Sequence, residues 1–166
     1  MIVISDSSPL ISLLKVSKLE LLRDLYNEVL IPVAVFNELT SNQSYKNEAD
    51  IIKNSSFIKI VLVKEEKSVD LLQRMTGLDL GESEAIIYAD ENKADILLMD
   101  EVSGRKVAKT LGIHVRGTIG ILLLAYDKKL LSADDVDEAM EILKTSKRRI
   151  SSELIQYAHD YVSKKE

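Results

Sequence analysis

Short apolar runs alternate with longer amphipathic stretches along the whole chain. The apolar runs lie at residues 2–4, 29–31, 58–63, 96–99 and 114–115, and their β-branched content is typical of strands buried on both faces. The stretches between them place apolar residues at helical spacing. Strands that alternate with helices predict a parallel sheet with helices on both faces. We therefore expect an α/β fold: three α/β/α layers around a central, mainly parallel sheet of four to five strands, followed by C-terminal helices.

Prolines and capping residues position the expected helices. Pro9 and Pro32 each follow an apolar run, and proline suits the first turn of a helix because its missing N–H has no partner there. Ser17, Ser132 and Ser151 are expected N-caps. The helices are predicted from about Pro9 and over residues 16–26, 33–40, 48–53, 64–75, 80–93, 102–111, 119–131, 133–144 and 152–164.

The length of 166 residues favours a single domain of ordinary size. Residues 1–131 contain all the expected strands and form the expected body of the domain. Residues 132–166 are more charged than the body and are expected to be helical. We expect this C-terminal extension to pack on the same domain or at a dimer interface.

Charge and composition narrow the classes of function. The chain has 22 Lys and Arg against 27 Asp and Glu, a net charge of -5, which argues against a broad basic surface for duplex nucleic acid. A short basic run, Lys147–Arg149, could hold RNA or an acidic partner segment, or could be a solvated helix end. The absence of Cys excludes disulfides and thiolate metal sites. No segment has the pattern of a signal peptide or a membrane span, so we expect a cytoplasmic protein with no membrane partner.

Acidic residues occur where two expected strands end. Asp6 follows the first strand, and Asp100 and Glu101 follow the strand at residues 96–99. Because the carboxyl ends of neighbouring parallel strands meet at one edge of the sheet, these groups are expected to converge. Glu82 and Glu84 begin the helix that leads to the second of these strands, and Glu38 lies on the helix after the second strand.

Carboxylates that crowd into one cleft repel one another unless they take up protons or bind a cation. Oxygen ligands without Cys or His suit Mg²⁺ or Mn²⁺, and such an ion activates water and neutralises a phosphate under attack. Two further residues could support the site: Ser8 could orient a ligand, and Arg105 could contact a phosphate or pair with a carboxylate.

Each of these residues also has a purely structural interpretation. Asp6, Ser8, Asp100 and Glu101 could cap helices, and Glu82 and Glu84 could serve only the positive end of a helix dipole. Glu38 and Arg105 could be ordinary solvated side chains. Other functional classes lack their motifs: the chain contains no phosphate-binding P-loop, no dinucleotide-binding G-x-G-x-x-G and no G-x-S-x-G nucleophile elbow.

The order and spacing of these motifs resemble the PIN-domain nucleases, a group that includes the VapC-type toxins. The first matching segment is Asp6-Ser7-Ser8-Pro9-Leu10-Ile11. The others are residues 35–39 (VFNEL), 81–86 (GESEAI), 97–101 (LLMDE), 104–105 (GR) and 117–120 (GTIG). The resemblance covers about residues 1–131. It implies a nuclease that uses Mg²⁺ or Mn²⁺ to hydrolyse phosphodiesters, usually those of RNA.

Carried over position by position, the resemblance implies four metal ligands. They are Asp6, Glu38, Glu84 with Glu82 as its rival, and Asp100 with Glu101 as its rival. It also implies a homodimer and, if the chain is the toxin of a toxin–antitoxin pair, a small antitoxin protein as partner. The alternative is a catalytically inactive PIN-like module that binds RNA or a protein partner through the same groove.

Overall fold

The computed structural model describes residues 1–146 and 150–165. Its five strands form one parallel sheet in the order β3-β2-β1-β4-β5. The strands are β1 (Val3–Ser5), β2 (Val29–Pro32), β3 (Ile58–Val61), β4 (Ile96–Leu98) and β5 (Val115–Arg116). The expected α/β fold with a parallel sheet of four to five strands is thus confirmed.

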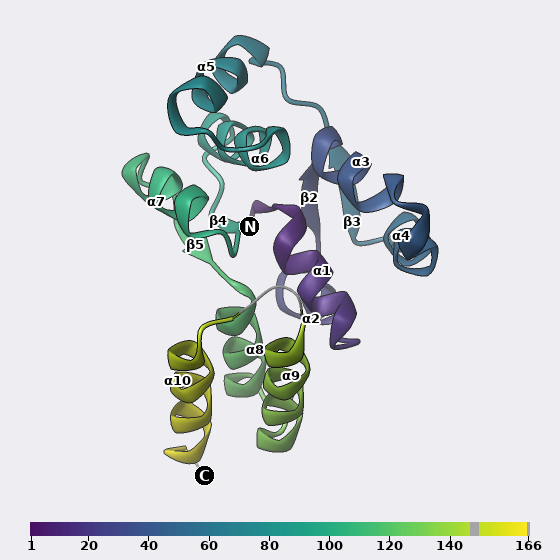
Figure 1. The fold of residues 1–166 in the computed structure, drawn as a ribbon, viewed down its shortest axis with the longest axis vertical. Helices are drawn as coiled ribbons and strands as arrows, with labels where there is room; N and C mark the ends of the chain where they lie inside the picture. The colour runs from purple at the N-terminus through teal and green to yellow at the C-terminus, as the bar shows by residue number, and fades with distance from the viewer. Residues whose placement is uncertain (147–149, 166) are drawn as a thin grey trace.

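Helices follow the strands in the predicted alternation, as Figure 1 shows. They are α1 (Ser7–Lys15), α2 (Leu21–Tyr26), α3 (Val33–Ser41), α4 (Lys46–Asn54), α5 (Glu66–Thr76), α6 (Leu80–Glu91), α7 (Val102–Thr110), α8 (Thr118–Asp127), α9 (Ala133–Thr145) and α10 (Ser152–Ser163), with a short 3₁₀ helix at Gln43–Tyr45.

The sheet separates two hydrophobic clusters, because successive side chains of a strand point to opposite faces. Val3 and Leu98 face the larger cluster, which includes apolar side chains of α1, α2, α8, α9 and α10. Ile4 and Leu97 face the smaller cluster, which contains buried side chains of α6 and Ala108 of α7. The protein therefore has three layers, with the sheet in the middle.

The C-terminal helices join the larger cluster. Met140 and Leu143 of α9 and Ala158 and Val162 of α10 are buried in the same cluster as the sheet residues. α9 begins with a capping box in which Ser132 and Asp135 exchange hydrogen bonds, and the Ser151 hydroxyl accepts a hydrogen bond at the start of α10. Ser132 and Ser151 are N-caps, as predicted. The division at residue 131 stays a prediction.

Two local predictions were wrong. The expected helix over residues 16–26 with Ser17 as its N-cap is a turn followed by the shorter α2, and Ser17 has φ of 54°. The helix expected at 119–131 ends at Asp127, followed by a turn in which Lys129 has φ of 61°. Both segments have enough leucine to continue a helical pattern, but the connection to the next element requires a tight turn there.

The basic run Lys147–Arg149 lies outside the described residues. Within the described ranges, no helix is long and apolar enough to cross a membrane.

Truncating a core side chain of α9 tests how far this helix contributes to the stability of the whole domain. Met140 is fully buried, so Met140→Ala should lower the free energy of unfolding by about 2–5 kcal/mol, through lost burial and a cavity. The measurement is urea unfolding followed by circular dichroism. Ile142→Ala is the matched control, because Ile142 lies on the same helix but is 37% exposed. Equal losses in the two variants would contradict a packed α9.

Candidate active site at the sheet edge

The candidate site lies at the point where the strand order reverses. β1 lies between β2 and β4, so the chain crosses from one half of the sheet to the other between these strands. In open α/β sheets, the crevice past the carboxyl ends of the strands at such a point is the usual place for a ligand. Asp6 directly follows β1, and Asp100 follows β4 by two residues.

The Asp6 carboxyl group is the most unusual polar group of the site. Its side chain is 1% exposed, and its Oδ1 atom has no hydrogen-bond partner in the structure. Asp6 occupies the N-cap position of α1, but its side chain accepts no capping hydrogen bond. A buried acceptor left unpaired costs about 1–3 kcal/mol, and more when it is charged. Helix capping alone therefore does not account for this residue.

Burial and neighbouring acids raise the pKa of Asp6 from 3.8 to about 7. Burial is the largest cause, because the charged form loses its hydration. The backbone of Ser7 acts in the opposite direction, and the carboxylates of Glu82, Glu38 and Asp79 raise the pKa further by repulsion. These three acids are therefore the charged neighbours that shift the pKa of Asp6.

Glu38 links the starts of two other helices at the site. Its Oε1 atom accepts a hydrogen bond from the Ser7 hydroxyl at 3.0 Å, at the beginning of α1. Its Oε2 atom lies against Gly81 in the first turn of α6, where a β-carbon would come within 3.3 Å of it. Glu38 itself is exposed. Two positive helix ends thus stabilise the negative charge that an acidic cluster collects.

Glu82 is buried and forms a capping box with Asp79 at the start of α6. The Asp79 side chain accepts from the Glu82 backbone at 2.8 Å, and Glu82 Oε2 accepts from the Asp79 backbone at 3.0 Å. Burial raises the pKa of Glu82, the hydrogen bond from Asp79 lowers it, and the charges of Asp79, Glu101 and Glu38 raise it further. Glu82 therefore both caps α6 and belongs to the cluster around Asp6.

Glu84 has a different partner. Its Oε2 atom accepts a hydrogen bond from the backbone N–H of Ala34 at 3.0 Å, in the first turn of α3. Glu84 is not among the charges that raise the pKa of Asp6. The preference for Glu84 over Glu82 as a metal ligand stays a prediction, and the surroundings of the two carboxylates favour Glu82.

Asp100 is held by Thr118 at the start of α8. The Thr118 backbone N–H donates to Oδ1 at 2.7 Å, and its hydroxyl donates to Oδ2 at 2.6 Å. Arg105 reaches the same corner, where its Nη1 atom donates to the Met99 carbonyl at 3.1 Å. A β-carbon on Gly117 would come within 2.8 Å of Asp100 and 2.6 Å of Arg105. Glycine at this position therefore allows both side chains to approach the backbone.

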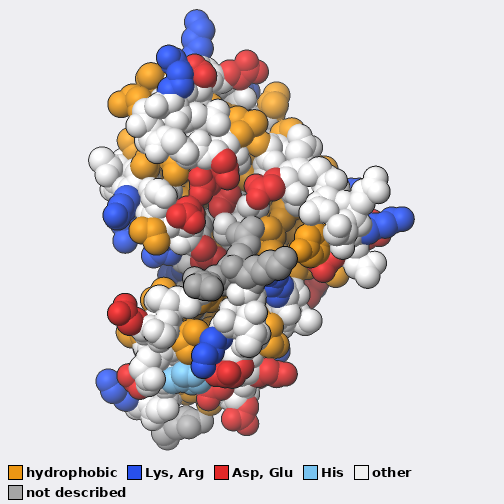
Figure 2. Space-filling model, in the orientation of Figure 1, with side chains coloured by type: hydrophobic (Ala, Val, Ile, Leu, Met, Phe, Trp, Pro, Cys, Tyr) orange, Lys and Arg blue, Asp and Glu red, His pale blue; other side chains and the backbone are white. Residues whose placement is uncertain are grey.

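The remaining predicted residues lie at the rim. Glu101 is exposed, is the N-cap residue of α7 and accepts a hydrogen bond from the Ser103 hydroxyl at 3.2 Å. Ser8 is half-buried and lines the same groove as Asp100, Glu101 and Arg105. Figure 2 shows acidic side chains gathered on one face of the molecule, just below α6.

The structure therefore places Glu38 and Glu82 where their charges raise the pKa of Asp6, and Glu101 where its charge raises the pKa of Glu82. It turns Glu84 and Asp100 toward helix starts. The sequence interpretation missed three residues that shape the site: Ser7, Asp79 and Thr118. The D-x-x-E spacing of Asp79 and Glu82 is a capping-box signature and could have identified Asp79. No local pattern marks Ser7 or Thr118 as partners of Glu38 and Asp100.

The acidic cluster matches the chemistry of a hard divalent cation. Its donors are carboxylate oxygens, and one of them, Asp6 Oδ1, is buried without a partner. Within the described residues, however, no three His, Cys, Asp or Glu side chains converge closely enough to enclose an ion. The donors fit such a cation in kind.

Comparison with known proteins agrees with the geometry. The model of the DUF3368 family, described as a PIN domain, matches residues 2–164. This match covers the body of the domain and nearly all of the C-terminal extension. None of the curated proteins compared with the chain matches it.

The raised pKa of Asp6 predicts how the stability of the metal-free protein varies with pH. In the folded state the Asp6 carboxyl keeps its proton up to about pH 7, whereas in the unfolded chain it keeps the proton only up to about pH 3.8. The contribution of Asp6 to stability is therefore fully present below about pH 4 and is lost as the pH rises from there through 7. Asp6→Asn should remove this loss, so that at pH 8 the variant is more stable than the parent by about 2–4 kcal/mol.

The measurement is urea unfolding in a chelator at several pH values between 4 and 8. Asp50→Asn is the control, because Asp50 is an exposed acid on α4. A parent and Asp6→Asn variant with the same stability at pH 8 would show that Asp6 carries no such penalty.

Proposed function

The chain belongs to the PIN-domain family, and on that basis we propose that it is a metal-dependent endoribonuclease acting at the acidic site around Asp6. PIN domains are generally nucleases, and the observation that supports activity here is the buried, unpartnered carboxyl of Asp6 among other acids. A buried carboxyl with a strongly raised pKa is typical of a functional site, because its charged form is unfavourable until a cation binds.

We assign Asp6, Glu38 and Glu82 as the residues that hold Mg²⁺ or Mn²⁺. Glu84 and Asp100, the other ligands that the sequence predicts, remain candidates, with Glu101 as the rival of Asp100. A bound cation would supply an activated water and would offset charge on the phosphate under attack.

The protein's own groups account for orientation and charge. The Ser7 hydroxyl orients the Glu38 carboxylate, and Thr118 orients Asp100 through two hydrogen bonds. Such outer partners fix the direction of a ligand, and losing one typically costs about 10–100-fold in metal affinity or activity. Arg105 uses one N–H on Met99 and keeps other donors for a phosphate oxygen. Ser8 lies at the edge of the groove that leads to these groups.

The toxin role is a narrower form of the same proposal. It adds a homodimer, a small antitoxin protein that blocks the site, and an RNA substrate in the cytoplasm. What supports it is the resemblance to the VapC-type toxins. A small antitoxin gene directly beside this one would support it further.

The second candidate is an inactive PIN-like module that binds RNA or a protein. The observation that favours it is the lack of three convergent metal-ligating side chains among the described residues. Calorimetric titration with Mn²⁺ distinguishes the candidates, because a nuclease of the proposed kind binds the ion and an inactive module gives no signal at millimolar metal.

Cleavage of a labelled RNA in the presence of Mg²⁺ or Mn²⁺ tests the main proposal. Asp6→Asn should cut RNA at least about 100-fold more slowly than the parent, since it removes a ligand rather than an outer partner. Chelation should abolish cleavage by the parent. Asp50→Asn should cleave like the parent. Equal rates for the parent and Asp6→Asn would contradict the assignment, and a DNA strand of the same sequence tests the preference for RNA.

A pair of matched variants separates the rival ligands on α6. Glu82→Gln should weaken Mn²⁺ binding and cleavage more strongly than Glu84→Gln, because only Glu82 lies among the charges that Asp6 senses. The glutamine at position 84 keeps an oxygen that can accept from Ala34, so folding is preserved. Calorimetry and cleavage rates provide the two readouts. A greater loss in Glu84→Gln would identify Glu84 as the ligand.

A further inference from the structure

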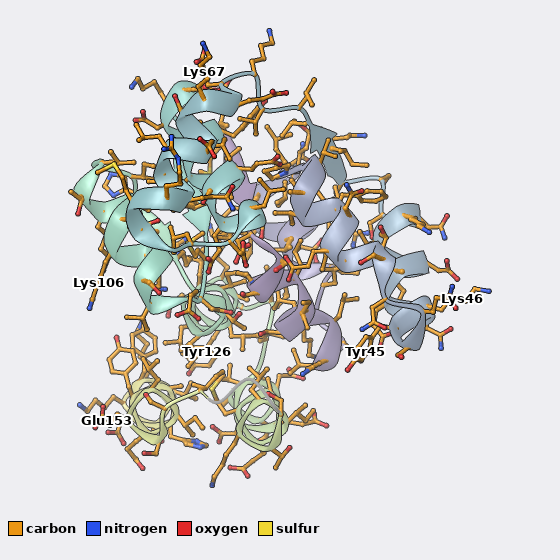
Figure 3. All side chains as sticks on the ribbon, turned by 45° about the horizontal axis from the view of Figure 1, so that its top comes forward. Tyr45, Lys46, Lys67, Lys106, Tyr126 and Glu153 are labelled. Atoms are coloured by element: carbon orange, nitrogen blue, oxygen red, sulfur yellow. The ribbon has the colours of Figure 1, made fainter. Side chains whose placement is uncertain are left out.

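A groove of about 860 Å³ leads from the candidate site along α8 to α10. Its lining starts at Ser8, Asp100 and Glu101 and ends at Tyr157 and Tyr161. Figure 3 shows α10, with Glu153, on the same side of the molecule as α7, with Lys106. A cleft of this size is in the range that proteins use to bind ligands.

Two guanidinium groups in the groove have hydrogen-bond donors to spare. Arg105 donates to the Met99 carbonyl, and Arg116 donates to the Tyr26 hydroxyl at 2.9 Å. Each guanidinium carries five N–H donors. Among the described residues, neither side chain forms an ion pair with a carboxylate. Both groups can therefore bind the oxygens of a phosphate.

The acids that line the groove beyond its rim are already paired. Asp100 accepts two hydrogen bonds from Thr118. Asp127 accepts from Lys165 at 2.6 Å and from the Tyr161 hydroxyl at 2.7 Å. Glu101 and Asp127 are the exposed acids of the described lining, and Lys165 offsets the charge of Asp127. The three acids of the lining are therefore matched by the two guanidinium groups and Lys165, so the described groove carries no excess of negative charge, although the whole chain carries a net charge of -5.

The far end of the groove presents aromatic rings. Tyr157 is 55% exposed, and its ring centroid lies 6.1 Å from that of Tyr161. Lys165 lies over the Tyr161 ring, 4.3 Å from its centroid, so Tyr157 is the more available of the two. Exposed Leu154 of α10 lies beside them in the lining. Aromatic faces next to cationic side chains are the features on which unpaired bases stack.

We propose that this groove binds single-stranded RNA beside the cleavage site, with phosphates on Arg105 and Arg116 and an unpaired base on Tyr157. The groove's connection to Asp100 and Glu101 makes this a deeper statement of the proposed function, on which it rests. A duplex is excluded as the preferred ligand, because paired bases keep their faces stacked on one another and cannot reach Tyr157.

Fluorescence anisotropy with a short labelled RNA strand tests this directly. The full chain carrying Asp6→Asn is used in a chelator, so that binding is measured without cleavage. Adding Tyr157→Ala should weaken binding at least about fivefold, the low end of what losing one stacked base costs. The Tyr157→Phe variant should bind the RNA as tightly as the protein that retains Tyr157, because phenylalanine keeps the aromatic ring.

Two further arms identify the mode of binding. Arg116→Gln should reduce the slope of log affinity against log salt by about 0.7, the value for one phosphate contact on a single strand, whereas Tyr157→Ala should leave the slope unchanged. The same RNA annealed to its complement should bind more weakly than the single strand. Tyr45→Ala is the matched control, because Tyr45 is 50% exposed and lies on the opposite side of the molecule from α10 (Figure 3).

Two results would overturn the proposal. One is that the Asp6→Asn protein does not bind the RNA strand, and the other is that adding Tyr157→Ala leaves its affinity unchanged. Either result would favour a protein segment as the ligand of the groove instead. Because no turnover is measured, these outcomes are separate from a failure of the cleavage experiment. If RNA binding depends on Tyr157 but the parent protein does not cleave RNA, the groove proposal stands and the proposed nuclease activity does not.

Discussion

The burial of one carboxyl group, Asp6, is the constraint around which the site is built. It follows β1, the central strand of the sheet, it is 1% exposed, and its Oδ1 atom has no partner. Folding places this group there at a cost, since burial and neighbouring acids raise its pKa to about 7. A group under such a penalty is favourable only when it is protonated or when a cation is bound. Stability and proposed activity therefore make opposite demands on the same atom.

The surrounding helices reduce that cost without removing it. α1 and α6 both begin at the acidic cluster, and their unpaired N–H groups favour negative charge nearby. Glu38 connects the two helix starts through Ser7 and Gly81, while Glu82 is fixed by its capping box. The same side chains thus serve helix ends and crowd Asp6. Helix capping and the proposed ligand site are therefore compatible with one arrangement rather than alternatives.

α8 connects this site to the C-terminal helices. Its first residue, Thr118, holds Asp100, and its buried side chains share a core with α9 and α10. The groove proposed to bind RNA runs along this helix, so its two ends are set by the same rigid element. This explains why the extension after residue 131, which contains no strand in the described part, is relevant to a site formed at the sheet edge.

The order of elements and the parallel sheet were accessible from local patterns. Periods of two and 3.6 residues, with prolines and serine caps between them, depend only on neighbouring residues, so the alternation of strands and helices was confirmed. The position of Asp6 past β1 follows from the same information, because every parallel strand points its carboxyl end to one edge of the sheet. The short turns at Ser17 and Lys129 were missed because leucine-rich segments satisfy a helical pattern whether or not the chain must turn.

The partners of each carboxylate depended on packing that no local pattern contains. Glu82 and Glu84 are two residues apart on α6, which is about 200° around a helix, so they face different neighbours. Which of them meets Asp6 depends on how α6 is rotated against β1 and α3. Asp100 likewise follows a strand next to β1, yet it turns to Thr118, eighteen residues further along the chain. Local sequence therefore determines which elements form and where their acids lie along the chain. The rotation and contact of those elements, set by the shared core, determine which acids meet.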